Sequence, residues 1–201
     1  SFNTLDHRVP LLSLGNVFDS TELKAWHTRA ARLLGDDKFD MVCELKIDGL
    51  AVAVIYEGGR LQTGATRGDG LKGEDVTQNL RAIKSLPLSV SIDTGFEVRG
   101  EVYMSRSGFD RMNAERAELG QSLFANPRNA AAGALRQLDP RISASRPLDI
   151  FVYALGWTDG PMPDNHWNVM ETLKSLQFKT NPSNPLCHKL EEVEDYYREW
   201  E

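Results

Sequence analysis

The apolar residues between positions 20 and 34 follow the spacing of one face of a helix. Asp19 and Glu22 form a capping box at its start, and Gly35 stands at its end. The apolar residues at helical spacing between them are Leu23, Trp26, Ala30, Leu33 and Leu34. This pattern predicts an amphipathic helix between Asp19 and Gly35, preceded by an extended segment over residues 1–18, which show no periodicity.

Farther along the chain, β-branched and aromatic residues gather in short runs that predict strands. The adjacent glycines Gly58 and Gly59 separate two of these runs and are typical of a two-residue hairpin turn. The predicted strands cover residues 41–46, 50–56, 60–66, 96–104 and 147–157.

The remaining elements are predicted helices. The loop that begins with Arg67-Gly68-Asp69-Gly70 leads into a predicted helix over residues 74–83. Further helices are predicted over residues 107–119, from Asn126-Pro127 onward, and over residues 167–176 and 190–200. Strands and helices occur in mixed order with hairpins between neighbouring strands. This order predicts the α+β class with an antiparallel sheet.

Composition and charge narrow the class of protein. The chain has 201 residues, 41% of them hydrophobic and 26% charged, which is typical of one soluble globular domain. No long apolar run or secretion signal occurs, so we expect a cytoplasmic protein without a membrane segment. The net charge of −6 requires any phosphate contacts to be local. Cys43 and Cys187 lack CxxC spacing, which predicts two free thiols and no zinc site.

Lys46 lies at the end of the predicted strand 41–46 and is followed by Asp48 and Gly49. Strand alternation would place Glu44 and Lys46 on one face. A lysine amine attacks only when unprotonated, so a catalytic lysine needs burial or nearby cations. Gly49 permits a sharp turn, and Asp48 can hold the lysine, a metal ion or a phosphate-bound water. From these residues alone, a surface ion pair of Lys46 with Glu44 or Asp48 is the simpler interpretation.

Five longer segments follow one another in order: PLLSLGNVFD, CELKIDGLAV, ATRGDGLKGEDVT, FEVRGEV and FANPRNAAAGALRQLDPR. In order and spacing they resemble the bacterial NAD-dependent DNA ligases, strongly over residues 8–157 and weakly over the rest. The motif over residues 46–49 is shared with ATP-dependent ligases, RNA ligases and mRNA capping enzymes, whereas FANPRNAAAG discriminates against them. The resemblance implies the nucleotidyltransferase (ATP-grasp-like) fold, in which antiparallel sheets flanked by helices enclose an adenosine pocket.

The resemblance also implies roles for single residues. Lys46 is the implied nucleophile that becomes linked to AMP, and Asp48 supports the lysine and the metal-bound phosphate. The implied contacts to the adenylate or to NAD are Ser13, Leu14, Glu44, Arg67 and Glu101.

Simpler alternatives remain open for these contacts. Ser13 can belong to a turn before the helix, and Arg67 can be a charge at a hairpin end. Glu101 can form a cross-strand ion pair with Arg99 or another neighbour.

Two arginines in the last segment are candidates for nucleic-acid binding. On a continuous helix Arg128 and Arg136 lie eight residues apart, roughly on one face, where they can form a local phosphate grip. The resemblance implies the same role for the two arginines, because this segment faces nicked DNA in the family. The alternative is a solvated helix face.

The function implied by the resemblance is DNA ligation in three phosphoryl-transfer steps. Lys46 attacks the α-phosphate of NAD and expels nicotinamide mononucleotide. AMP then passes to the 5′-phosphate at a nick in double-stranded DNA, and the 3′-hydroxyl displaces AMP to seal the strand. Mg²⁺ is the expected partner of the phosphates, with Mn²⁺ as a substitute, and its ligands are not assigned. We expect a monomer.

Several segments of complete family members do not occur in these 201 residues. They are a DGVVIK strand, a lysine-bearing KFP motif, the N-terminal nicotinamide-recognition module and the domains that follow. We therefore expect residues 1–201 to be a partial adenylation domain with weak or absent self-adenylation. Two interpretations stay open beside it. One is a non-catalytic adenosine- or DNA-binding fragment, and the other is an ATP-dependent ligase or capping-type nucleotidyltransferase.

Overall fold

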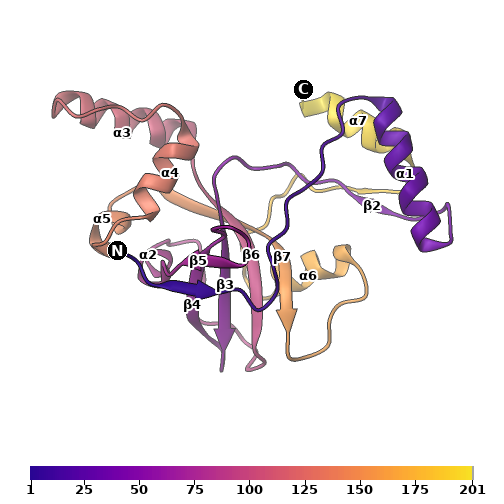
Figure 1. Cartoon of the computed structure of the whole chain (residues 1–201), viewed down its shortest axis with the longest axis horizontal. Helices are drawn as coiled ribbons and strands as arrows, with labels where there is room; N and C mark the ends of the chain where they lie inside the picture. Colours follow the sequence, from indigo (N-terminus) through magenta and orange to yellow (C-terminus); the bar gives the residue numbers. More distant parts are fainter. Residues whose placement is uncertain (201) are drawn as a thin grey trace. The chain divides into compact units, whose positions relative to one another are not determined.

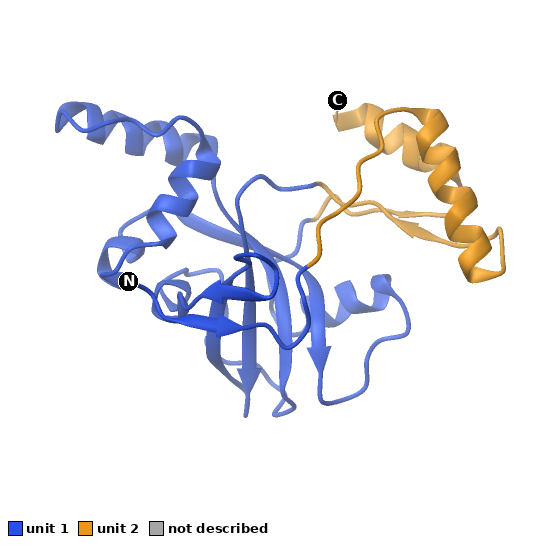
Figure 2. Cartoon of the chain, viewed as in Figure 1, with its two compact units in different colours: residues 1–11, 46–181 blue, residues 12–45, 182–201 orange. Residues whose placement is uncertain are grey.

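A computed structural model describes residues 1–200, which divide into two compact units (Figure 2). Of the described residues, unit 1 contains 1–11 and 46–181, and unit 2 contains 12–45 and 182–200. Each unit is therefore built from segments far apart in the sequence. No helix within residues 1–200 is both long and apolar enough to cross a membrane.

The centre of unit 1 is an antiparallel sheet with the strand order β4, β3, β6, β7 (Figure 1). Its hairpin turn uses Gly58 and Gly59, which both have positive φ as this turn requires. Four of the five predicted strands form this sheet and are confirmed, two with the same bounds and two to within one residue. The observed bounds are β3 Leu50–Glu57, β4 Arg60–Thr66, β6 Phe96–Met104 and β7 Leu148–Thr158. The predicted α+β class with antiparallel sheet is confirmed.

One face of this sheet is apolar and forms the core of unit 1. Strand alternation directs Val52 and Val54 of β3, and Val98 and Val102 of β6, to this face, and all four are fully buried. Three helices supply the covering apolar residues, among them Leu80, Leu135 and Leu173. These helices are α2 Thr77–Arg81, α4 Pro127–Leu135 and α6 His166–Ser175. The predicted helix 167–176 is therefore confirmed with a shift of one residue.

The opposite face of the sheet carries charged side chains among its apolar ones. The carboxylate of Glu97 is almost completely buried and accepts hydrogen bonds from Nε of Arg99 at 3.0 Å and from the Trp157 indole at 3.2 Å. Arg99 also donates to the carbonyl oxygens of Val9 and Pro10. This arginine therefore attaches the N-terminal segment to this face, and the buried carboxylate keeps its hydrogen-bond partners.

A second, two-stranded sheet in unit 1 corrects two predictions. Strand β1, Thr4–Asp6, lies within the segment expected to be only extended and pairs with β5, Lys72–Glu74. The predicted helix 74–83 is wrong at its start, because Glu74 belongs to β5. The helix α2 begins only at Thr77, whose backbone N–H and hydroxyl both donate to the Asp75 carboxylate.

Two further helices complete the described helices of unit 1, and helix α4 begins where the sequence predicts. Helix α3, Arg106–Glu118, confirms the predicted helix 107–119 to within one residue. Helix α4 begins as predicted, with Pro127 in its first turn and Asn126 as the cap that accepts the N–H of Asn129. The short helix α5, Pro140–Ala144, was not predicted.

Unit 2 contains helices α1 and α7 and the short strand pair β2–β8. Helix α1, Ser20–Leu34, has the predicted Asp19 cap, which accepts the N–H of Glu22 at 2.8 Å, and ends at Gly35 with φ 73°. The other observed bounds are α7 Leu190–Trp200, as predicted, β2 Met41–Val42 and β8 Leu186–Cys187.

The predicted strand 41–46 is wrong after Val42. Cys43 still donates its N–H to the carbonyl of Pro185, but a proline has no N–H to donate in return. The ladder between β2 and β8 therefore stops there. Residues 44–46 are not in a strand, so strand alternation does not place Glu44 and Lys46 on one face.

Both thiols of unit 2 are free, as predicted, and buried. The sulfur atoms of Cys43 and Cys187 lie 3.6 Å apart, and burial together with this contact raises the pKa of Cys43 to about 12. We expect iodoacetamide at pH 8 to alkylate Cys43 at least ~100-fold more slowly in the folded chain than in guanidinium chloride, because the thiolate is the reactive form. Mass spectrometry over time measures both rates, and equal rates would contradict the buried thiol pair.

Candidate active site

Lys46 and Asp48 lie on the segment that leads into strand β3, and the side chains of both are exposed. Gly49 follows them and is buried against strand β6. A Cβ atom at this glycine would overlap the carbonyl oxygen of Val102 and approach Cγ of Glu101 to 3.1 Å. Only glycine permits this close approach. The glycine of the motif thus brings Lys46 and Asp48 close to Glu101.

Glu101 is the half-buried carboxylate of this site. Burial raises its pKa, and the charge of Asp48 acts in the same direction. Three interactions oppose this rise in pKa without cancelling it, namely the charge of Lys46, a hydrogen bond from the Gly49 N–H and the charge of Arg128. The structure therefore gathers Lys46, Asp48, Glu101 and Arg128 within electrostatic range of one another.

Strand register extends the site across the sheet. Ala51 of β3 pairs with Glu101 of β6, and its carbonyl accepts the N–H of Arg67, which directly follows β4. Arg67 and Glu101 thus flank one small residue at the same level of the sheet. The alternative cross-strand pair of Glu101 with Arg99 is wrong, because Arg99 binds Glu97 instead.

The loop after Arg67 is a tight turn. The Asp69 carboxylate accepts the N–H groups of Leu71 and Lys72, and these bonds lower its pKa. The Arg67 carbonyl accepts the Gly70 N–H and lies 3.1 Å from Nε2 of His7. Several bonds therefore hold the backbone of Arg67 in place beside strand β3.

The two candidate DNA-binding arginines have different partners. Nε of Arg128, in the first turn of α4, lies 3.9 Å from Asp48. Arg136 follows the last residue of α4 and binds Glu74 with two nitrogens. The predicted continuous helix face is wrong, because the helix ends at Leu135. Arg128 belongs to the lysine site, and Arg136 to a separate ion pair.

Three predicted contacts lie in unit 2. Ser13, Leu14 and Glu44 are all exposed, Leu14 by 77%. Glu44 accepts a hydrogen bond from Asn184 at 3.3 Å. The group gathered within unit 1 therefore consists of Lys46, Asp48, Glu101 and Arg128, and the roles of the three residues of unit 2 stay predictions.

One cluster beside Glu101 was missed by sequence reasoning. Phe151, the register partner of Glu101, stacks on Tyr103 with ring centroids 4.9 Å apart. Lys179 lies over the Phe151 ring and forms an ion pair with Asp149. Burial favours the neutral form of Asp149, but hydrogen bonds led by that of Lys179 lower its pKa. Alternation along β6 could have placed Tyr103 beside Glu101, whereas Lys179 is distant in sequence and gave no signal.

The acidic groups of the site suit a phosphate-bound cation better than an all-protein metal site. Within residues 1–200 no group of three or more His, Cys, Asp or Glu side chains is placed to hold a metal ion. Mg²⁺ is commonly held by one or two carboxylates together with substrate phosphates. Asp48 and Glu101 supply that number of carboxylates.

Replacing Glu101 by glutamine should change how stability depends on pH. Because the folded pKa is raised above its ordinary value of 4.5, the wild-type chain loses stability relative to Glu101→Gln as pH rises from 4.5 through the raised pKa. Urea unfolding of both proteins between pH 4 and pH 8 measures this difference. Glu57→Gln, at an exposed position, is the control. A difference that is constant with pH would contradict the raised pKa.

Unit 1 thus combines an antiparallel sheet with a lysine, two carboxylates and an arginine at one end of strand β3. This combination defines a mixed α+β domain whose site suits phosphate-bearing ligands, because cations bind phosphate and carboxylates bind hydroxyl groups or metal ions. A family model described as the NAD-dependent DNA ligase adenylation domain matches residues 1–201. The chain belongs to this family, which confirms the resemblance seen in the sequence.

Individual relatives agree with the family. The chain is 55% identical over 202 residues to a DNA ligase of Dehalococcoides mccartyi, 47% identical over 199 residues to one of Halalkalibacterium halodurans and 46% identical over 200 residues to one of Bacillus cytotoxicus. These matches cover 99–100% of this chain. The chain spans about 30% of the length of each of these relatives.

Proposed function

We propose that this chain is the part of an NAD-dependent DNA ligase that accepts AMP, and that Lys46 is the residue that carries it. The observation that supports this most is the group of Lys46, Asp48, Glu101 and Arg128 at one end of the sheet, in a chain that matches the adenylation-domain family along its whole length. The surface ion pair of Lys46 with Asp48 is less well supported, because Asp48 pairs with Arg128.

The proposed first step forms a bond between Nζ of Lys46 and the α-phosphorus of NAD. The bond from that phosphorus to the bridging oxygen breaks, and nicotinamide mononucleotide leaves with the electron pair. Lys46 must lose a proton for its lone pair to attack. Exposure of the amine gives water access to this proton.

The neighbouring groups would bind and orient the nucleotide. The Glu101 carboxylate can accept hydrogen bonds from ribose hydroxyls, and Arg67 can donate to a polar group of the ligand from its fixed backbone. Ser13, Leu14 and Glu44 are proposed as further contacts to the adenylate. Mg²⁺, when bound through phosphates and the carboxylates of Asp48 or Glu101, would neutralise developing negative charge.

Two later transfers would complete the reaction on nicked double-stranded DNA. The DNA 5′-phosphate attacks the phosphorus of lysyl-AMP, and the P–N bond to Lys46 breaks. The 3′-hydroxyl then attacks the activated 5′-phosphate and AMP leaves. Arg128, placed beside Asp48, can bind phosphate during these transfers, and Arg136 can bind the DNA backbone.

A chimeric ligase tests the proposal. Residues 1–201 replace the aligned segment of the Dehalococcoides mccartyi DNA ligase, and sealing of a nicked duplex is measured with NAD or with ATP. We expect sealing with NAD and Mg²⁺, and none with ATP. Sealing with ATP would favour an ATP-dependent nucleotidyltransferase. Retention of labelled AMP without a covalent bond would favour a non-catalytic adenosine-binding module.

A further inference from the structure

Arg136 holds a carboxylate in the geometry that arginine uses for phosphate. Its Nε lies 2.6 Å from Oε2 of Glu74, and its Nη2 lies 2.8 Å from Oε1. Two parallel bonds of this kind match either a carboxylate or two oxygens of a phosphate. The side chains are 51% and 36% exposed, so an anion from solution can reach the arginine.

Glu74 is held at this position by its own backbone. It is the last residue of strand β5, pairs in register with Thr4 of β1, and donates its N–H to the Thr66 hydroxyl at 3.0 Å. Its carboxylate is therefore presented to Arg136 by an ordered strand. Because exposed ion pairs contribute little stability, a second anion can displace it at small cost.

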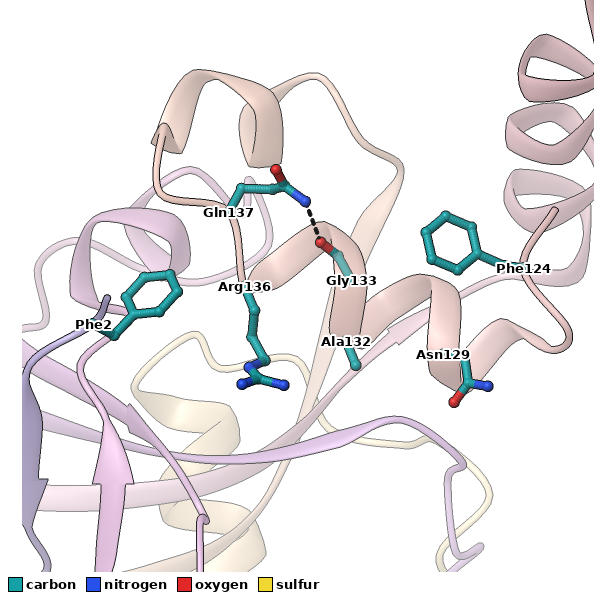
Figure 3. A pocket seen from close by; sticks show the side chains of 7 residues that line it. All are labelled: Phe2, Phe124, Asn129, Ala132, Gly133, Arg136 and Gln137. Atoms are coloured by element: carbon teal, nitrogen blue, oxygen red, sulfur yellow. Dashed lines mark hydrogen bonds between the residues drawn. The ribbon is translucent and has the colours of Figure 1, made fainter. Parts of the chain in front are cut away.

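Arg136 of this ion pair also lines a pocket of about 410 Å³ (Figure 3). Its polar lining comes from Asn129, Arg136 and Gln137, and its apolar lining from Phe2, Phe124, Ala132 and Gly133. Figure 3 shows Phe2 and Phe124 on opposite sides of helix α4, with Arg136 extending between Phe2 and Ala132. The volume and the mixture of aromatic rings and amides suit a single nucleotide.

The wall formed by Phe124 is ordered in advance. Asn113 accepts the N–H of Phe124 and donates to its carbonyl, both at 3.0 Å. The guanidinium of Arg116 lies 4.6 Å from the centre of the ring. A Cβ atom at Gly133 would approach this ring to 2.9 Å, so the ring and helix α4 are closely packed.

We infer that Glu74 occupies, in the free chain, the position of a DNA backbone phosphate on Arg136, and that DNA binding exchanges one for the other and brings the adjoining nucleotide into the pocket. This inference rests on the proposed function, because it takes nicked DNA as the ligand. It adds that the Glu74 carboxylate competes with the DNA phosphate for Arg136. Glu74 lowers the affinity of the chain for DNA, and it keeps the Arg136 side chain ordered while no DNA is bound.

The test measures binding of the 201-residue chain to a fluorescently labelled nicked duplex by anisotropy. We expect Glu74→Gln to bind about fivefold more tightly than wild type, which corresponds to about 1 kcal/mol. Arg136→Gln should bind about tenfold more weakly than wild type. Adding Glu74→Gln to Arg136→Gln should change nothing further, because the competitor acts only through this arginine.

Glu57→Gln is the matched control, since it removes one exposed negative charge from unit 1 outside the pocket. It should change affinity by less than about twofold, and thermal unfolding confirms that each variant is folded. The inference is overturned if Glu74→Gln binds the duplex no more tightly than Glu57→Gln. It is also overturned if Glu74→Gln still increases affinity in the Arg136→Gln background, or if neither wild type nor Glu74→Gln binds the duplex. Lysyl-AMP formation in the chimera is measured separately. Failure of the Glu74 inference can therefore be distinguished from failure of the proposed function.

Discussion

Replacing Lys46 by arginine in the chimeric ligase should reduce the transfer of AMP from NAD to the protein at least ~10³-fold, which makes it undetectable in an ordinary assay. A guanidinium keeps its positive charge and its hydrogen-bond donors but has no basic lone pair at any pH the protein tolerates. The charge that Lys46 contributes beside Glu101 and Asp48 would therefore remain. Only the nucleophile would be lost.

The measurement uses NAD labelled in its AMP half, with covalent label followed on a denaturing gel and located by peptide mass spectrometry. Lys84→Arg, at another exposed lysine of unit 1, is the matched control and should retain full labelling. Label that survives Lys46→Arg, or that maps to another residue, would show that Lys46 is not the acceptor.

Replacing Gly49 by alanine should lower the free energy of unfolding by about 3 kcal/mol and remove AMP transfer. The new methyl group would overlap the Val102 carbonyl oxygen on the adjacent strand and crowd the Glu101 side chain. A backbone atom within a sheet cannot move away as a flexible side chain can. Strands β3 and β6 would have to separate beside Glu101, within electrostatic range of Lys46.

Urea unfolding and AMP labelling measure the two effects of this substitution. Gly15→Ala is the control, because a Cβ atom at Gly15 has no neighbour within 4 Å. It should leave both stability and labelling within experimental error. A Gly49→Ala protein as stable as wild type would show that the strands tolerate the extra atom.

The sheet of unit 1 could be predicted from the sequence because its signals are local. Runs of β-branched and aromatic residues mark β3 and β6, and the adjacent Gly58 and Gly59 mark the hairpin between β3 and β4. Each signal lies within the element it predicts. These strands therefore agree with prediction to within one residue.

Predictions failed where an element depends on a distant partner. Strand β1 exists because β5 pairs with it, and the same pairing removes Glu74 from the predicted helix. Strand β2 ends at Val42 because its partner strand is preceded by Pro185. A short segment has too weak a preference of its own to decide between strand, helix and coil.

The amino-acid sequence was sufficient for the family and for the candidate nucleophile, because Lys46, Asp48 and Gly49 are adjacent and the five longer segments occur in a definite order. Which groups surround that lysine depended on the folded chain. Strand register places Glu101 within electrostatic range of Lys46, and helix α4 brings Arg128 to Asp48. The pairing of Arg136 with Glu74 likewise joins residues from separate elements. Contacts of this kind depend on distances in space, and linear spacing does not specify them.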